Sequence, residues 1–406
     1  MNKRDFIKIA AANAFGLYLI PQSNATSDVF MPAKHVIYLF MDGGMSHLDT
    51  FDPKENSEVN GGVKLIDTNL DGVRISSRFE NLAKRMDKIC LIRSMTSQMG
   101  AHEQGQYLSR TSFGRRGTIV HPHLGAWMSH IFSSKKTLPR NVVISPSNRH
   151  PRSGFLDKVH SPISVVDPNK GLENSKIKIT PDQFDKRLEL LGTIDKNFPS
   201  GGATKAHEQF YEEALKLVQS KEVSSFDISK ESNDLRDKYG RNKFGQGCLL
   251  ARRLVENGTK FVEISHGGWD THQNNNQQMD TKVPAVDQGL SALISDLNSR
   301  GMLEDTLIVL TTEFGRTPKI NSNYGRDHHI TAFSSVLVGG PIKQGFLYGA
   351  SDEKGLLVES NPVKVQDFNA TIAKAAGVDI EKEYLSPEGR PFKVANKGVP
   401  ILDVFA

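Results

Sequence analysis

The sequence contains few cysteines, and it has no long run of apolar residues or of charge of one sign. Its 406 residues include two cysteines, Cys90 and Cys248, which lie far apart in apolar surroundings and fit buried free thiols. No CxxC pattern occurs, which excludes a cysteine zinc knuckle. The net charge of +5 is mild, and the basic residues are scattered without interleaved aromatic residues. This pattern argues against a nucleic-acid partner.

The N-terminal segment is too short and too weakly apolar to span a membrane. Residues 1–25 combine a basic start, a moderately apolar stretch and small residues that fit a cleavage site, which predicts an export signal. The stretch KRDFIK (3–8) resembles a twin-arginine signal with lysine in place of the first arginine, and Sec export or lipid anchoring are alternatives. We therefore expect a bacterial protein that is exported to the periplasm or the extracellular space, with no membrane span.

Short apolar runs alternate with helical patterns along the rest of the chain. The runs predict buried strands of a largely parallel sheet over 35–41, 89–93, 141–145, 260–264, 306–311 and 334–340. Helices are expected over 79–87, 123–132, 246–258, 283–301 and 367–377. Residues 34–406 are thus expected to form one α/β domain. Its Lys-, Glu- and Asp-rich part, 165–243, with an amphipathic helix near 205–220, is predicted to be a helical insertion or cap.

Metal-ligand residue types follow several of these runs. Asp42, Glu313 and the pair Asp270 and His272 come directly after apolar strands, and the group 327–329 (DHH) precedes another. Because ligand sites of open α/β sheets lie beyond the carboxyl ends of the strands, we expect these side chains to converge. Any one of them alone also fits a helix cap or a surface ion pair. Together they predict a divalent metal site, for which carboxylate and imidazole ligands favour zinc, with manganese, magnesium and calcium as alternatives.

Five stretches carry a family resemblance. They are YLFMDGGMSHLDTFDP (38–53), RSMTSQMGAHEQGQYLSRTSF (93–113), CLLARRLVENGTKFVEISHGGWDTH (248–272), TTEFGRTP (311–318) and GRDHH with GGPIKQG (325–345). Together they resemble the domain of unknown function 1501, a family of exported bacterial proteins within the alkaline phosphatase and sulfatase superfamily. The resemblance spans about residues 34–400. It implies an alkaline-phosphatase-like three-layer α/β/α sandwich and a site for phosphate or sulfate esters.

The resemblance also implies roles for individual residues. Asp42 matches the metal-binding aspartate of the first strand, and Asp270 with His272 resembles the Asp–His pair of the other metal position. Glu313 stands where the superfamily has an aspartate, and one of His328 and His329 resembles the last histidine ligand. The predicted metal ligands are therefore Asp42, Asp270, His272, Glu313, His328 and His329.

Two departures from the superfamily pattern concern catalysis. Phe314 stands where a histidine ligand is expected, and His102 stands where the attacking residue is expected. His102 is thus a candidate catalytic residue or the missing metal ligand. The nearby hydroxyls that remain candidate nucleophiles belong to Ser94, Thr96 and Ser97. The absence of a cysteine at this place rules out formylglycine chemistry of the sulfatase kind.

The sequence leads to two functional hypotheses. The first is a metal-dependent hydrolase of phosphate or sulfate esters of small molecules or glycans, in which a metal-activated hydroxyl or water attacks. In it Arg316 clamps the anionic group, with Arg93 and Arg110 as alternatives. The second is a catalytically inactive protein that binds sulfated or phosphorylated glycans through its metal. Phe314 and His102 favour the second hypothesis.

Overall fold

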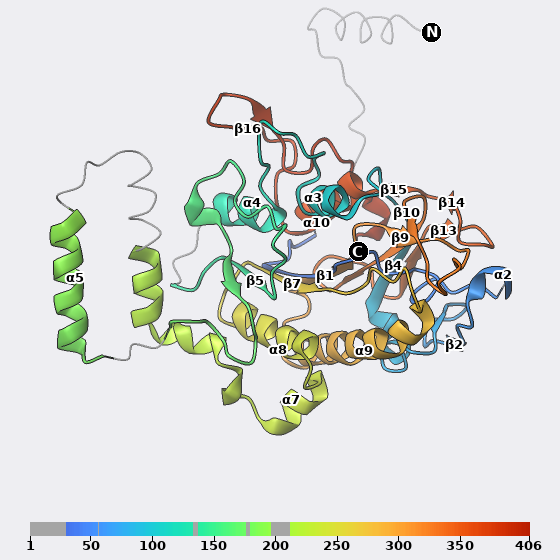
Figure 1. Cartoon of the computed structure of the whole chain (residues 1–406), viewed down its shortest axis with the longest axis horizontal. Coiled ribbons are helices and arrows are strands. Elements are labelled where there is room, and N and C mark those ends of the chain that lie inside the picture. The colour runs from blue at the N-terminus through green and yellow to red at the C-terminus, as the bar shows by residue number, and fades with distance from the viewer. Residues whose placement is uncertain (1–29, 56, 133–136, 176–178, 196–211) are drawn as a thin grey trace, which may run out of the picture. The chain divides into compact units, whose positions relative to one another are not determined.

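A nine-stranded sheet forms the central layer of the protein (Figure 1). This computed structural model describes residues 30–55, 57–132, 137–175, 179–195 and 212–406. Residues Pro32–Ala406 form one compact unit. The expected export segment, 1–25, lies outside the described residues. The helix expected near 205–220 is described only in part: residues 205–211 lie outside the described residues, and residues 212–219 are helical.

The strand order in the sheet is β12-β4-β11-β8-β1-β7-β5-β6, and β15 pairs with β4. The strands are β1 (His35–Met41), β4 (Ile89–Thr96), β5 (Asn141–Ile144), β6 (Ile163–Val165), β7 (Phe261–His266), β8 (Thr306–Thr311), β11 (Phe333–Val338), β12 (Phe346–Tyr348) and β15 (Val363–Lys364). The central strands β1, β7 and β8 are almost fully buried, which is why they are mainly apolar in the sequence, with Glu263 of β7 as a buried exception.

One strand of this sheet runs against the others. β1 pairs in parallel with β7 and β8, and β4 pairs in parallel with β12 and β15. β11 lies between β4 and β8 and is antiparallel to both. The amino end of β11 therefore lies at the same edge as the carboxyl ends of its neighbours. The prediction of a largely parallel sheet is confirmed, with β11 as the reversed strand.

Helices cover both faces of the sheet (Figure 1). α8 (Lys243–Glu256) and α9 (Asn275–Ser299) lie on one face, and α3 (His102–Thr111), α4 (Leu124–Ile131) and α10 (Val365–Ala375) lie on the other. The buried side chains of α8 pack on β7, and its first turn is capped by the side chain of Asn242, which accepts from the N–H of Gly245 at 2.9 Å. The predicted α/β/α layering is confirmed.

Shorter elements surround this core. They are α2 (Ser57–Asn60), β2 (Leu65–Asp67), β3 (Arg74–Ser76), the 3-10 helix η1 (Leu82–Lys88), η2 (Lys158–His160), α5 (Pro181–Asp195), η3 (Lys221–Phe226), η4 (Ile228–Lys230), α7 (Asn233–Tyr239), β9 (Gly315–Arg316), β10 (His328–His329), β13 (Ala350–Ser351), β14 (Val358–Ser360), β16 (Tyr384–Leu385), β17 (Pro391–Phe392) and η5 (Leu402–Val404). In the described part of 165–243, the elements after β6 are all helical, and α7 packs on α8 and α9. None of the helices in the described ranges is both long enough and apolar enough for a membrane crossing.

Most helix and strand predictions agree with the structure within a few residues, but two differ. The helix expected over 79–87 is the 3-10 helix η1, Leu82–Lys88. The helix expected over 283–301 begins eight residues earlier, at Asn275, and contains Pro284. Proline is tolerated there within the long helix α9, whose face toward the core, including Val283 and Val286, is buried.

Candidate metal centre

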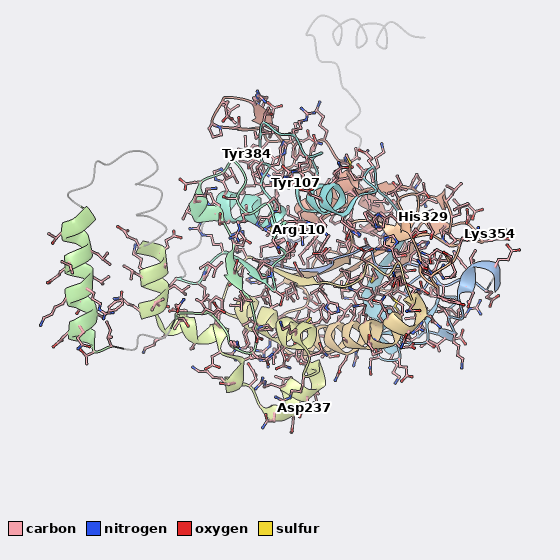
Figure 2. All side chains as sticks on the ribbon, viewed as in Figure 1. Tyr107, Arg110, Asp237, His329, Lys354 and Tyr384 are labelled. Carbon is pink, nitrogen blue, oxygen red and sulfur yellow. The ribbon has the colours of Figure 1, made fainter. Side chains whose placement is uncertain are left out.

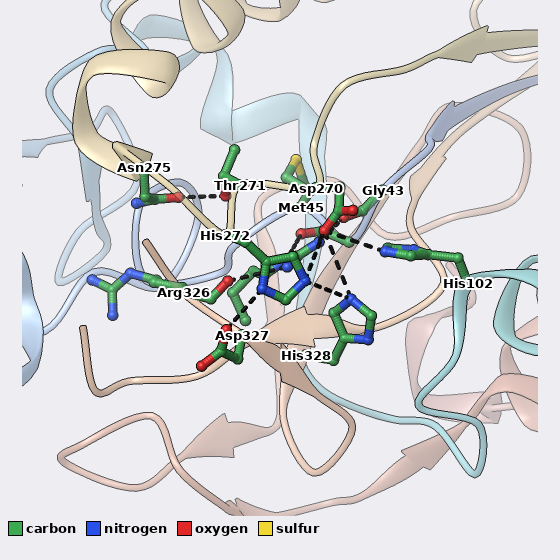
Figure 3. Close-up of polar contacts among 12 residues, drawn as sticks. Gly43, Met45, His102, Asp270, Thr271, His272, Asn275, Arg326, Asp327 and His328 are labelled. Atoms are coloured by element: carbon green, nitrogen blue, oxygen red, sulfur yellow. Dashed lines mark hydrogen bonds and ion pairs between the residues drawn. The ribbon is translucent and has the colours of Figure 1, made fainter. Parts of the chain in front are cut away.

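Three histidines surround a single carboxylate oxygen of Asp270 (Figure 3). From Asp270 Oδ1 the distances are 3.3 Å to Nε2 of His102, 3.1 Å to Nε2 of His272 and 3.7 Å to Nε2 of His328. Nη2 of Arg316 lies 2.7 Å from the same oxygen. The Nε2 atoms of His272 and His328 are 3.1 Å apart. Three imidazole nitrogens and a carboxylate oxygen thus gather around one point.

The other ring nitrogen of each histidine faces a hydrogen-bond acceptor. Nδ1 of His102 lies 2.8 Å from Oε1 of Glu313, that of His272 lies 2.7 Å from Oδ1 of Asp327, and that of His328 lies 2.6 Å from the carbonyl oxygen of Gly100. Ionised carboxylates and carbonyls only accept, so each Nδ1 carries the proton in these contacts. In the neutral rings, Nε2 then presents its lone pair toward Asp270.

This arrangement fits a divalent cation. Zinc bonds of about 2.0–2.1 Å in a tetrahedral site place the ligand atoms about 3.3 Å from one another. Four of the six separations within the cluster, 3.1, 3.1, 3.3 and 3.7 Å, are close to that value. The ligand atoms of His102, Asp270 and His328 all lie within 4.8 Å of one another, and His272 adds its contacts with Asp270 and His328. Nε2 of His102 is buried without a hydrogen-bond partner. Burial lowers the pKa of His102, but Glu313 and then Asp270 outweigh it and raise that pKa, so a proton on Nε2 is the alternative to a bound cation. Metal-bound histidines in other proteins likewise donate a hydrogen bond from their second ring nitrogen to a carboxylate or a carbonyl.

The loops after β1 and β7 bring Asp270 to this point. Gly43 has φ +122°, and a Cβ there would lie 2.5 Å from the backbone nitrogen of Asp270, so only glycine allows this approach. The carbonyl of Asp42 accepts from the N–H of Trp269 at 3.2 Å, and the indole of Trp269 is fully buried. His102 arrives from α3, where Gly105 lets the helix pack closely on Glu313 and its neighbour.

Asp42 and Glu313, both predicted metal ligands, lie beside the cluster and make hydrogen bonds within the protein. The fully buried Glu313 accepts from the N–H of Gly43 at 2.9 Å and from the hydroxyl of Thr312 at 3.0 Å, in addition to His102. The carboxylate of Asp42 accepts from the side chain of Gln106. Burial, and then the charge of Glu313, raises the pKa of Asp42. In this geometry Glu313 orients the ring of His102. The carboxylates of Asp42 and Glu313 together place negative charge beside that ring.

His328 and His329 point in opposite directions, as adjacent residues of a strand do. His328 belongs to the cluster. Nε2 of His329 lies 2.8 Å from the carbonyl oxygen of Leu356, and its ring stacks on that of His47 at 6.1 Å between centroids. Among the two candidates, the structure therefore places His328, and not His329, at the centre.

The three candidate hydroxyls lie away from Asp270. Ser94 is fully buried on β4, with its Oγ against the backbone of Gly349. Thr96 donates to the carbonyl of Val363 at 3.2 Å, and Ser97 donates to that of Met99 at 3.4 Å. In the described ranges, no contact joins these hydroxyls to the histidine cluster.

The donors of Arg316, the predicted anion clamp, are engaged within the protein. The side chain is fully buried and donates to the carbonyls of Gly43 and Gly44, and to that of Arg326 at 3.1 Å, besides its ion pair with Asp270. Burial opposes ionisation of Asp270, but Arg316 and then His102 outweigh it and lower the pKa of that carboxyl. Four of the five N–H donors of Arg316 are used in these contacts, so the side chain in this geometry fixes Asp270 and the loop after β1.

Residues 33–405 match the sequence profile of a family described as protein of unknown function, DUF1501. The chain belongs to this family. No curated protein shows significant similarity to it. The predicted family membership is confirmed.

Solved structures similar to this DUF1501 chain match it at low identity and with low TM-scores. The PsFucS1 sulfatase from Pseudoalteromonas sp. is 13% identical, with 94% of this chain and 73% of that chain covered and a TM-score of 0.42. The lipoteichoic acid synthase LtaP from Listeria monocytogenes is 9% identical over 87% and 75%, with a TM-score of 0.44. The alkaline phosphatase from the Antarctic bacterium TAB5 is 13% identical over 86% and 99%, with a TM-score of 0.38.

A second buried cluster in this DUF1501 protein was not predicted from the sequence. Glu263 on β7 pairs with Arg110 at 2.9 Å and with Nε2 of His150 at 3.2 Å, and His123 lies beside them. Burial opposes the ionised form of Glu263, but Arg110 and His150 outweigh it and hold its pKa below the usual range. The signal was present in FVEIS (261–265), because a glutamate inside an apolar strand needs a buried partner.

The Glu313→Gln substitution tests the orienting role. The amide oxygen can still accept from Gly43 and His102, which share Oε1, but the amide group carries no charge and its nitrogen cannot accept from Thr312, so the hold on Nδ1–H of His102 weakens. We expect zinc affinity to fall about 10–100-fold, the usual effect of losing a partner of a ligating histidine. Isothermal titration calorimetry with zinc measures it. Glu58→Gln, on an exposed carboxylate paired with Lys354, is the control, and equal affinities of both variants would contradict the role.

Proposed function

We propose that this DUF1501 protein is a hydrolase of phosphate or sulfate esters that depends on a divalent metal ion, with zinc as the favoured metal. The observation that carries the proposal is the orientation of His102, His272 and His328, whose Nε2 atoms all face Oδ1 of Asp270 because their Nδ1 atoms donate elsewhere. Three neutral imidazoles and one carboxylate form a ligand set typical of zinc, in which the carboxylate balances part of the ion's charge.

The residues around the cluster have separate tasks in this proposal. A bound ion would neutralise ester oxygens and lower the pKa of a coordinated water. Glu313 and Asp327 hold the proton on Nδ1 of His102 and His272. The buried ring of Phe314 packs on His102 at 5.1 Å and on His328 at 4.7 Å between centroids, which limits water access from that side. Asp42 remains a predicted ligand for a second cation, which would offset the repulsion from Glu313.

Attack by water rather than by a side chain fits the described contacts. Ser94, Thr96 and Ser97 are hydrogen-bonded or packed elsewhere. His102, at the place where the superfamily has its attacking residue, has Nδ1 tied to Glu313 and Nε2 turned to Asp270. Its proposed role is therefore that of a metal ligand.

The same observation also favours the second candidate, a protein that binds anionic glycans through its metal without hydrolysing them. No side-chain nucleophile contacts the cluster in the described ranges, and Phe314 occupies a position where the superfamily has a ligand. Both candidates share the metal site, the export predicted from residues 1–25 and a substrate or ligand with sulfate or phosphate groups. They differ in turnover.

Metal analysis paired with ester hydrolysis separates them. We expect the purified full chain to contain zinc or another divalent metal by mass spectrometry. Its turnover of p-nitrophenyl phosphate or p-nitrophenyl sulfate should disappear after chelation and return when zinc is added. Bound metal without turnover of either ester, or of sulfated glycans, would support the binding protein. Turnover that survives full removal of the metal would contradict both.

Replacing the three hydroxyls tests the water-based route. The triple variant Ser94→Ala, Thr96→Val, Ser97→Ala is expected to keep the wild-type kcat, because none of these side chains contacts the cluster. Initial rates with the responsive chromogenic ester measure this, and circular dichroism checks the fold. A loss of about tenfold or more, equal to about 1.4 kcal/mol of barrier, would instead assign the nucleophile to one of them, and single variants would show which.

A further inference from the structure

A pocket near the carboxyl end of α3 has an unusual charge balance. It encloses about 460 Å³ between the segment 113–121 and the hairpin of β16 and β17. Its charged lining residues are Arg115, Arg116, Arg390, Lys393 and Lys397, against the single acid Glu383. Figure 2 places Tyr107 and Arg110 of α3, and Tyr384 of β16, on the sheet face opposite α8 and α9. The pocket therefore belongs to the face that α3 and α4 cover.

Part of this positive charge has no counter-charge within the described residues. Arg115 pairs with Glu103, and Lys393 pairs with Glu381 at 2.6 Å. No ion pair in the described ranges involves the other three cations, and all of these are exposed: Arg116, Arg390 and Lys397. Three unpaired cations around one concave space favour a ligand with several negative charges.

The floor of the pocket is aromatic and rigid. The rings of Phe113 and His121 stack at 4.1 Å between centroids, and Phe392 meets them edge-on at 5.6 and 5.1 Å. Burial, and then the charge of Arg116, lowers the pKa of His121 to about 4, so the floor is uncharged at neutral pH. The hydroxyl of Tyr107 lies 2.8 Å from Nδ1 of His121 and fixes that ring. Phe392 is only half-buried and leaves apolar surface open to a ligand.

An apolar floor ringed by cations matches a sugar that carries anionic ester groups. The C–H face of a sugar ring packs on aromatic surface, and guanidinium groups bind sulfate and phosphate through paired N–H donors. The volume lies within the about 300–1,000 Å³ of ordinary small-ligand sites. A single-stranded nucleic acid fits less well, because the faces of Phe113 and His121 are buried against each other and are not free to stack on bases.

The pocket is separate from the metal centre. α3 begins at His102 and has ten residues, which span about 15 Å at 1.5 Å per residue. The pocket lining begins at Phe113, beyond the far end of this helix. A single esterified sugar at the metal centre would not reach it.

We propose that this pocket is a second binding site for oligosaccharides that carry sulfate or phosphate ester groups, holding a substrate chain whose ester is cleaved at the metal centre. The substrate class rests on the proposed function, whereas the binding itself does not. Arg116, Arg390 and Lys397 bind the anionic groups, and Phe392 contacts the sugar ring.

Calorimetry on the metal-loaded full chain tests this site with a sulfated galactan hexasaccharide, a phosphorylated oligosaccharide of the same length and the desulfated sugar. The triple variant Arg116→Gln, Arg390→Gln, Lys397→Gln should bind the preferred ester at least about tenfold more weakly, or 1.4 kcal/mol. Its turnover of a small chromogenic ester should be unchanged. The control triple Lys84→Gln, Lys170→Gln, Lys230→Gln removes equal charge elsewhere on the surface and should bind as the wild type does.

Equal weakening by both triples, equal binding of the desulfated sugar, or tighter binding of a single-stranded RNA of matched charge would overturn the proposal. Tight binding of either the sulfated or the phosphorylated oligosaccharide supports the proposal, and the tighter-binding class identifies the preferred ester group. The Asp270→Ala variant separates this proposal from the proposed function. Oligosaccharide binding that persists in Asp270→Ala shows that the pocket binds without the metal centre. A wild-type protein that binds the oligosaccharide but turns over no ester leaves the pocket standing while the hydrolase fails.

Discussion

Asp270→Ala is expected to remove metal binding and all metal-dependent turnover. Among the described residues, Asp270 supplies the only carboxylate oxygen that lies within 4 Å of His102, His272 and His328 together. Without it the three imidazoles would hold a dication with no negative charge in contact. Losing an orienting partner of a ligand weakens metal affinity about 10–100-fold, so losing a ligand with formal charge should cost more than about 100-fold.

Thermal stability gives a readout that does not depend on activity. Zinc at 100 times its dissociation constant stabilises the native protein by about 2.7 kcal/mol, and the variant should gain almost none of this at the same zinc concentration. Asp280→Ala is the matched control, because Asp280 is also an exposed carboxylate 2.7 Å from an arginine, Arg78. A zinc-dependent shift in melting temperature that Asp270→Ala leaves intact would contradict the assignment of the centre.

Arg326→Met is expected to give the largest loss of folding stability. The guanidinium is fully buried and pairs at 2.8 Å with the equally buried Asp49. It also donates to the carbonyls of Val59 at 2.8 Å, Thr317 at 3.0 Å and Pro318. Removing one partner of a buried ion pair leaves an uncompensated charge, which costs about 3–5 kcal/mol. Denaturant unfolding, followed by circular dichroism, measures the loss.

The surroundings of Arg326 connect this loss to the metal centre. Its backbone N–H donates to the carbonyl of Thr271 at 3.0 Å, between Asp270 and His272, and its chain continues into Asp327 and His328. The double variant Asp49→Asn, Arg326→Met should recover part of the stability, because no buried charge remains unpaired. Arg241→Met, which removes an exposed pair with Asp237, should change stability far less. A loss from Arg326→Met as small as that of Arg241→Met would contradict the buried-pair account.

The fold could be predicted because its strands carry their own signal. β1 and β8 are buried on both faces, so each appears as a nearly unbroken apolar run, and β7 differs mainly by the buried Glu263. The direction of β11 was not predictable in this way, since an apolar run reads the same whichever way the strand points. Its reversal explains why His328, which precedes a strand, joins Asp270, which follows one.

The choice among neighbouring residues also needed the structure. Sequence reasoning placed metal-ligand residue types at one edge of the sheet, and Asp270, His272 and His328 do meet there. It did not separate His328 from His329, because which of two adjacent side chains faces a site depends on strand register. It proposed two roles for His102, and only the contact of its Nδ1 with Glu313 favours that of a ligand.

The amino-acid sequence by itself determined the α/β class, the family and the edge of the sheet where carboxylates and imidazoles gather. These follow from local patterns, in which apolar runs and the polar residues that end them are adjacent in the chain. Only the tertiary structure decided that Glu313 supports His102, that Arg316 is used within the protein, and that cations from residues 115–116 and 390–397 share one pocket. These depend on distances between segments far apart in sequence, which side-chain packing fixes and local pattern does not encode.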